Sequence, residues 1–343
     1  MAEIFWNSWS NESSRASIDH LFDAILLKKE SVFPDHIIVP EFKDQEKITL
    51  VTHIPPLYTT KENETLLYLF SQVLAFIPKK AETKILLECV NPDIASIWKE
   101  KHTNITLLTE DCFIDIKKPE IEFSPFSSKQ PKKKFLSNWF IPFELDQASQ
   151  IIPIMPIQPS PIFKVSGVIS SFFWLLPTKI KNEILIQKTF EQRSEAFMEI
   201  FSYLFPKISI SGTLYQGEIS FSVFGNDPAS VDAFSSALMS VKASSVPTTK
   251  YCRKNKIGMG DLLKIHVQGE RFKKPVTKDV QSFKEIFLLY FDPTKCTLCK
   301  KCIDLCPFQA IFCRDKTIFY HKKTCNRCGL CVAICPVSAI SEI

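Results

Sequence analysis

Glycine is unusually scarce in this chain, with only 8 glycines in 343 residues, against a usual share of about 7%. Loops that wrap a phosphate group need backbone angles that glycine tolerates best. The sequence also contains no GxGxxG, GxxxxGK[ST] or GxSxG pattern. The pair Gly258 and Gly260 precedes an expected strand rather than a helix, so it is not a dinucleotide fingerprint. These absences argue against nucleotide-binding and serine-hydrolase sites.

Long apolar runs are missing as well. The most apolar stretches, residues 151–157 and 165–177, are short and interrupted by proline, glycine or serine. They suit buried strands or a partner surface better than a bilayer. The start of the chain, MAEIFWNSWSNESS, has no basic segment followed by an apolar one, so no secretory signal is visible. We therefore expect a cytoplasmic protein without a membrane span.

No catalytic residue can be assigned from histidine. The six histidines form no HxxxH, HExxH or Cys/His pattern, so we expect ordinary surface or core roles for His20, His36, His53, His102, His266 and His321. Nucleic-acid binding has little support. The triplet Lys132, Lys133 and Lys134 lies in a proline-rich stretch, and a solvated loop explains so short a basic run.

Cysteine, in contrast, is abundant and clustered. Of the twelve cysteines, Cys89, Cys112 and Cys252 are scattered, and nine fall between Cys296 and Cys335. In a reducing compartment, clustered cysteines bind metal far more often than they form disulfides. The C-terminal segment therefore predicts a metal centre.

The clustered cysteines form a duplicated motif. The segments CTLCKKCIDLCP and CNRCGLCVAICP both read CxxCxxCxxxCP, with a constant offset of 29 residues. The similarity continues into CPFQAIF and CPVSAIS, where we expect a strand after each quartet. Cys313 lies between the two runs without this spacing, so we expect it not to be a ligand.

The spacing fits two 4Fe-4S clusters. Three closely spaced cysteines in one loop supply three ligands, and the fourth, which we expect to start a helix leading away, ligates the other cluster. We expect Cys296, Cys299, Cys302 and Cys335 to hold cluster one, and Cys325, Cys328, Cys331 and Cys306 to hold cluster two. Pro307 and Pro336 donate no backbone hydrogen bond, which leaves neighbouring amides for the sulfurs. Zinc is the competing metal, but its sites usually use paired CxxC units or mixed Cys and His ligands.

The C-terminal segment, residues 289–343, resembles the bacterial two-cluster ferredoxin in its eight-cysteine spacing. From Tyr290 onward it holds eight Lys or Arg against four Asp or Glu. Part of this excess, at Lys300, Lys301, Lys322, Lys323 and Arg327, would offset the negative charge of reduced clusters. The other interpretation is docking of an acidic redox partner, such as a ferredoxin, a flavodoxin or a redox enzyme subunit.

Residues 1–288 predict an α/β domain. Apolar residues repeat with helical spacing over residues 18–26, 64–77 and 190–204, and strands are expected at 48–54, 84–90, 105–108, 207–210, 219–224 and 262–267. Helices are also expected at 93–100, from Asp227 onward, and before Gly258. This alternation predicts a mixed or mostly parallel sheet. The pattern lapses over the proline-rich residues 117–161. We predict this α/β domain plus a small α+β ferredoxin-like domain.

The stretch 225–270 resembles the C-terminal part of the domain of unknown function 362 family. The matching positions include Asp227, Pro228, Val231, Asp232 and Gly258. Polar motifs common in that family are replaced here by PIQPSPIFK and VISSFFWLLP, and its acidic, glycine-rich turn is reduced to SGTLYQGEIS. The resemblance implies a large domain that keeps the family's packing skeleton. Asp227 and Asp232 are both explained by the start of a helix, where carboxylates satisfy free amides.

Three functions follow from these patterns. The first is an iron-sulfur electron carrier in which the α/β domain is a docking platform. The second is a redox enzyme that binds a substrate or flavin in the large domain. The third is an assembly subunit of a larger redox complex, with residues 151–177 as its contact face. The missing polar motifs favour the carrier over the enzyme.

Overall fold

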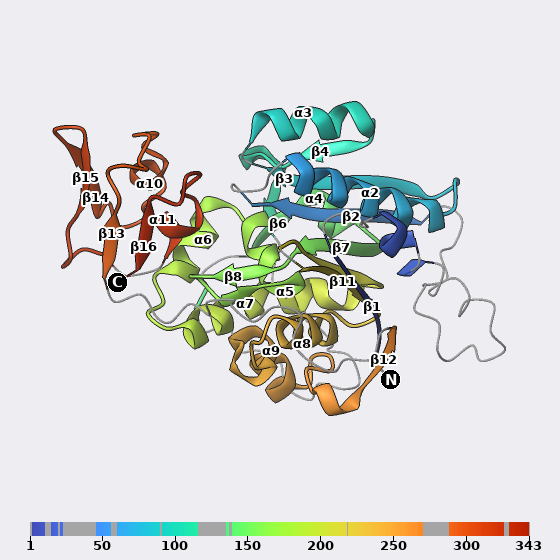
Figure 1. Ribbon diagram of the computed structural model, residues 1–343. Coiled ribbons are helices and arrows are strands. Elements are labelled where there is room, and N and C mark those ends of the chain that lie inside the picture. The colour runs from blue at the N-terminus through green and yellow to red at the C-terminus, as the bar shows by residue number, and fades with distance from the viewer. Residues whose placement is uncertain are drawn as a thin grey trace.

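The computed structural model describes residues 2–10, 15–19, 21–22, 46–55, 60–89, 91–115, 135–136, 139–217, 219–269, 288–325 and 329–342. Two parts are evident in Figure 1, a large α/β part and a small C-terminal part with the cysteines. The basic triplet at residues 132–134, together with Cys328, lies outside the described residues.

One eight-stranded sheet organises the large part. Its order is β12-β1-β11-β10-β7-β2-β3-β4. The strands are β1 (Ala2–Ser10), β2 (Lys47–Ile54), β3 (Glu82–Cys89), β4 (Ile105–Leu107), β7 (Gln150–Pro156), β10 (Ser211–Tyr215), β11 (Ile219–Gly225) and β12 (Ile265–Gly269). Only β11 runs antiparallel to its neighbours; the other pairings are parallel. The prediction of an α/β domain with a mostly parallel sheet is confirmed.

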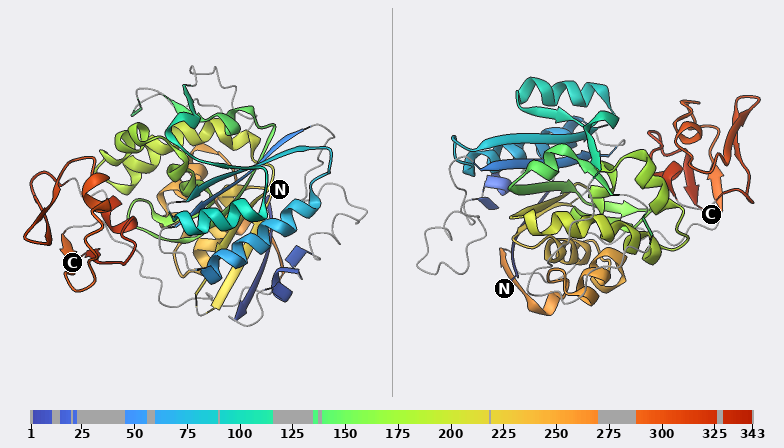
Figure 2. Two further views of the ribbon diagram at one scale, coloured as in Figure 1. Left: turned by 90° about the horizontal axis from the view of Figure 1, so that it is seen from above. Right: turned by 180° about the vertical axis from the view of Figure 1, so that it is seen from behind.

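Helices cover both faces of this sheet (Figures 1 and 2). On one face lie α2 (Thr60–Phe76) and α3 (Pro92–Lys101), together with helical residues at 15–19 and 21–22. The other face carries α5 (Val168–Ser171), α6 (Thr178–Leu185), α7 (Phe190–Leu204), α8 (Pro228–Leu238) and α9 (Pro247–Asn255). Each face of the sheet packs against its own hydrophobic core. Because the sheet is covered on both sides, consecutive residues of its strands are buried.

Short elements connect these layers. They are β5 (Phe113–Asp115), β6 (Phe140–Pro142), α4 (Phe143–Gln147), β8 (Gln158–Ser160), β9 (Lys164–Ser166) and the 3-10 turns Glu110–Cys112, Phe172–Leu175, Phe205–Lys207, Ala243–Ser245 and Leu262–Lys264. No helix in the described ranges is long and apolar enough to cross a membrane.

The expected lapse over residues 117–161 is wrong for its second half. Residues 140–160 form β6, α4, β7 and β8, and β7 lies in the middle of the sheet. This strand agrees with the apolar stretch 151–157, which suited a buried strand despite its prolines. The pairing of β7 with β2 ends at Pro153, and its pairing with β10 ends at Pro156, so each proline takes the last position of a ladder. A missing N–H is tolerated there better than within a ladder.

Two further expectations need correction. The strand expected at residues 207–210 is displaced, because only Ile208 forms an isolated bridge and β10 begins at Ser211. The stretch 151–177, one candidate for a partner contact face, is mostly interior. Ile152, Ile162 and Phe173 are fully buried, and most of its other apolar residues are nearly so. These residues form core, which leaves the assembly function without its contact face.

Candidate metal centre

The C-terminal part is built as two related halves. Two antiparallel ribbons pair β13 (Leu289–Phe291) with β16 (Ile340–Glu342), and β14 (Ile311–Arg314) with β15 (Thr317–Tyr320). The register repeats the 29-residue offset, since Ile311 pairs with Tyr320 as Ile340 pairs with Phe291. A strand thus follows each cysteine quartet, as predicted. The two ribbons frame the cysteine loops.

Each cysteine loop contains one short helix. The helix α10 (Lys301–Asp304) holds Cys302, and α11 (Leu330–Ala333) holds Cys331. The fourth cysteines, Cys306 and Cys335, come after these helices. The expectation that the fourth cysteine starts a helix is therefore wrong: the third cysteine lies within the helix, and the chain turns back after it.

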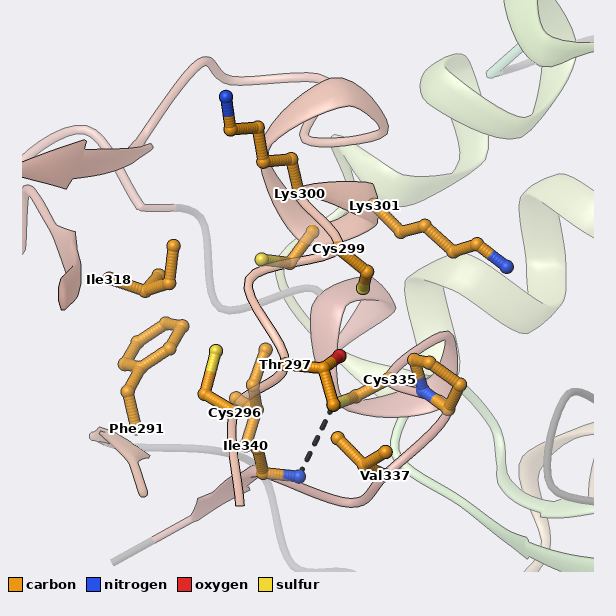
Figure 3. A pocket seen from close by; sticks show the side chains of 13 residues that line it. Phe291, Cys296, Thr297, Cys299, Lys300, Lys301, Ile318, Cys335, Val337 and Ile340 are labelled. Atoms are coloured by element: carbon orange, nitrogen blue, oxygen red, sulfur yellow. Dashed lines mark hydrogen bonds between the residues drawn. The ribbon is translucent and has the colours of Figure 1, made fainter. Parts of the chain in front are cut away.

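Four of the predicted ligands line one hollow. The first pocket is lined by Cys296, Cys299, Cys302 and Cys335, with Phe291, Ile318 and Ile340 on its apolar side (Figure 3). The thiols are close enough to interact electrostatically. Burial, followed by negative charge at Cys299, Cys335 and Cys296, raises the pKa of the Cys302 thiol to about 11. A positively charged metal group would remove this penalty.

A second pocket brings together the described members of the other predicted set. It is lined by Cys306, Cys325 and Cys331, together with Leu289, Ile311 and Leu330. The fourth predicted ligand of this set, Cys328, lies outside the described residues. In the described part of the chain, no three His, Cys, Asp or Glu side chains converge on a single ion. The cysteines surround each pocket instead.

Backbone amides point at the sulfur atoms. The amide of Ala310 donates to Cys306 Sγ at 3.3 Å, and that of Ala339 donates to Cys335 Sγ at 3.2 Å. The residues just before these alanines, Gln309 and Ser338, have φ angles of 49° and 48°, which turn the next amide back. Hydrogen bonds to sulfur stabilise thiolates, the form that binds iron. The donor set thus fits an iron-sulfur group.

The remaining cysteines are apart from both pockets. Cys313 is exposed on β14, Cys89 is half-buried at the end of β3, and Cys112 lies in a 3-10 turn. Cys252 is buried in α9, and burial, followed by the negative charges of Asp227 and Asp232, raises its pKa well above the ordinary value. None of the four lines a cysteine pocket.

Asp227 and Asp232 both accept hydrogen bonds from amides at the start of a helix, but not of the same helix. Asp227 accepts from the Ser230 amide at 2.7 Å and so caps its own helix, α8. Asp232 instead accepts from the amides of Val168 at 2.6 Å and Ile169 at 3.0 Å. It therefore satisfies free amides at the start of α5, a helix 64 residues earlier in the chain.

The contact between His53 and Glu88 was not anticipated from the sequence. His53, near the carboxyl end of β2, forms a part-buried hydrogen bond with Glu88, its register partner on β3. The His53 ring stacks on Trp174 at 5.0 Å and 12°. Its Nε2 is buried without a partner among the described atoms. Sequence spacing could not reveal this pair, because the two residues are 35 positions apart.

Comparison with known proteins agrees with the C-terminal assignment. Residues 288–336 match the family model of a 4Fe-4S dicluster domain, so this part of the chain is such a domain. No curated protein matches the chain. The match does not include residues 225–270, whose resemblance to the domain of unknown function 362 family stays a prediction.

Two solved structures show limited likeness. One is a Thermotoga maritima protein, with 13% identity and a TM-score of 0.35 over 59% of this chain and 50% of that one. The other is the lactate racemase apoprotein from Thermoanaerobacterium thermosaccharolyticum, with 12% identity and a TM-score of 0.37 over 65% and 53%. The chain thus matches about half the length of each.

Proposed function

We propose that this protein is a cytoplasmic electron carrier that holds two 4Fe-4S clusters in its C-terminal domain. The observation that carries the proposal is the division of the cysteines between two pockets. Cys296, Cys299, Cys302 and Cys335 line the first, and Cys306, Cys325 and Cys331 line the second. Each pocket thus mixes cysteines of both sequence runs, which supports crossed ligation, with Cys328 completing the second set. When bound, such clusters accept and release single electrons.

The chain supplies the environment of these ligands. Leu289, Ile311, Ile318 and Ile340 are buried around them and exclude water, and the amides of Ala310 and Ala339 stabilise negative charge on sulfur. Two oxidised clusters with their thiolates would carry a charge of about −4. The eight Lys or Arg against four Asp or Glu from Tyr290 onward offset that charge.

The proposal is tested by metal analysis of the anaerobically purified chain. We expect about eight iron and eight sulfide atoms per chain, with little zinc. A content of about four irons per chain would mean that only one cluster is bound. Zinc in place of iron would reject the proposal. The double variant Cys89→Ala and Cys313→Ala removes two cysteines that line neither pocket, so it should keep the full iron content.

A second candidate function, a redox enzyme, is favoured by the His53 and Glu88 pair. In parallel α/β sheets, ligands usually bind beyond the carboxyl ends of the strands. The carboxyl end of β2 points toward the side of the molecule where the cysteine domain lies (Figure 1). A flavin or substrate that copurifies with the wild type but not with His53→Ala, at equal iron content, would support this function over the pure carrier.

A further inference from the structure

The two halves of the cysteine domain differ in what they contact. In the second loop, Leu330 and Ile334 are 8% and 5% exposed and belong to the hydrophobic core of the large domain. Phe308 and Ala333 pack against the same core. Accordingly, α11 lies beside α6 in all views (Figures 1 and 2). The second loop is therefore docked onto the large domain.

Two of the positions that the repeat relates to these residues are exposed. Leu330 corresponds to Lys301, Ile334 to Leu305, and Phe308 to Val337 by the 29-residue offset. Leu305 is 45% exposed and Val337 is 36% exposed. Among the described residues, the large domain thus packs against Phe308, Leu330 and Ile334, while Val337 and Leu305, the equivalents of Phe308 and Ile334, stay exposed.

This asymmetry distinguishes the two pockets. Phe308 and Leu330 line the second pocket and also pack against the large domain, so that pocket lies next to the interface. The first pocket is lined by Cys299, which is exposed, and by Lys300 and Lys301. The two lysine side chains extend away from the sulfur atoms in Figure 3. The first pocket thus has a basic, accessible mouth.

The charges around this mouth are mainly positive. Neither Lys300 nor Lys301 forms a salt bridge within the described part of the chain. The nearby Lys295 pairs with Asp292 at 3.8 Å, and Asp304 is the one exposed acid of α10. Lys300 also has a φ of 60° where the second half has Gly329 at 79°. A lysine therefore occupies a backbone position that favours glycine.

We propose that the mouth of the first pocket, formed by Cys299, Lys300 and Lys301, is the docking surface for an acidic one-electron carrier protein. The inference rests on the proposed function and adds to it the site on the cysteine domain where the partner binds. The partner meets the first cysteine loop, whereas the second loop packs against the large domain. Complementary charge between the partners raises association rates by 10-fold to 1,000-fold at low salt.

Charge reversal with a matched control tests the surface. Lys316 is also an exposed lysine with a positive φ, 58°, but it lies in the β14–β15 turn and lines neither pocket. Stopped-flow electron exchange with flavodoxin, an acidic carrier, would be measured at low salt. We expect Lys300→Glu to lower the second-order rate by about tenfold or more, and Lys316→Glu by less than about twofold. Added salt should remove the difference.

A glycine pair separates charge from backbone effects. Lys300→Gly and Lys316→Gly both place glycine at a position with a positive φ angle, which glycine adopts without strain. Neither variant should therefore lower the melting temperature. Only Lys300→Gly should slow exchange with flavodoxin. Equal rates for the two variants would reject the docking surface, as would a wild type that exchanges electrons with basic cytochrome c but not with flavodoxin. Iron content and the electron paramagnetic resonance spectrum are measured in parallel, so a failure of the cluster proposal is seen separately.

Discussion

At the scale of single residues, the shortage of glycine shows in the backbone rather than in a missing site. Nine described residues other than glycine have positive φ angles, and six of these lie in the cysteine domain: Leu298, Lys300, Gln309, Asp315, Lys316 and Ser338. Each such residue costs about 1 kcal/mol relative to glycine. The tight turns of the cysteine domain are therefore built largely without glycine, the residue that would fit them most easily.

Crossed ligation can be tested one cysteine at a time. If Cys335 ligates the cluster in the first pocket, Cys335→Ala should abolish the same resonance signal as Cys299→Ala. The signal that Cys331→Ala abolishes should then remain in Cys335→Ala. Low-temperature electron paramagnetic resonance of the three variants, with iron analysis, makes the comparison. If Cys335→Ala instead reproduces Cys331→Ala, each run ligates its own cluster and the crossed arrangement is wrong.

Asp232 gives a pH dependence of stability. It is buried, and burial raises its pKa to about 7 despite the amides of Ile169 and Val168, which favour the charged form. The folded protein therefore binds a proton that the unfolded chain releases near pH 4. The contribution of this group to the free energy of unfolding should decrease as the pH rises from about 4 to about 7 and then level off.

Urea unfolding of Asp232→Asn at several pH values checks this slope. The variant should lose the decrease between pH 4 and 7, because its amide does not titrate. It should also be less stable by about 1–3 kcal/mol below pH 4, since one backbone amide of α5 loses its acceptor. An unchanged slope would mean that another group titrates.

At the scale of secondary structure, helices with regular hydrophobic spacing could be predicted from the sequence. The helix predicted around residues 190–204 is α7, Phe190–Leu204, because its apolar residues repeat with helical period. The central strand β7 was anticipated only as an apolar stretch at residues 151–157 that suits a buried strand or a partner surface, because its prolines interrupt the strand pattern. The cap that Asp232 gives to α5 could not be predicted, because it joins residues 64 positions apart. The cysteine spacing, in contrast, indicated which cysteines line each of the two pockets.

The docking of α11 predicts a difference between repeat-equivalent residues. Ile334→Ala should lower the free energy of unfolding by about 2–5 kcal/mol, because it leaves a cavity in the shared core. Leu305→Ala, at the corresponding exposed position, should change it by less than about 0.5 kcal/mol. Denaturant unfolding of the iron-loaded variants measures both, and similar losses would contradict the asymmetry of the two halves.

At the scale of the whole molecule, the protein is a three-layer α/β domain carrying a small cysteine domain on one side (Figure 2). The eight-stranded sheet draws its strands from residues 2–269, and the two ribbons of the cysteine domain come from residues 289–342. We propose 1–288 and 289–343 as the bounds of the two domains. The large domain supplies a docking base for one half and leaves the other open.

The central claim, two one-electron centres per chain, is tested most directly by anaerobic reductive titration followed by low-temperature electron paramagnetic resonance. We predict uptake of about two electrons per chain, with two 4Fe-4S signals that together account for about two spins. Uptake of one electron with one signal, or no reducible signal in protein that carries its full metal content, would contradict the account.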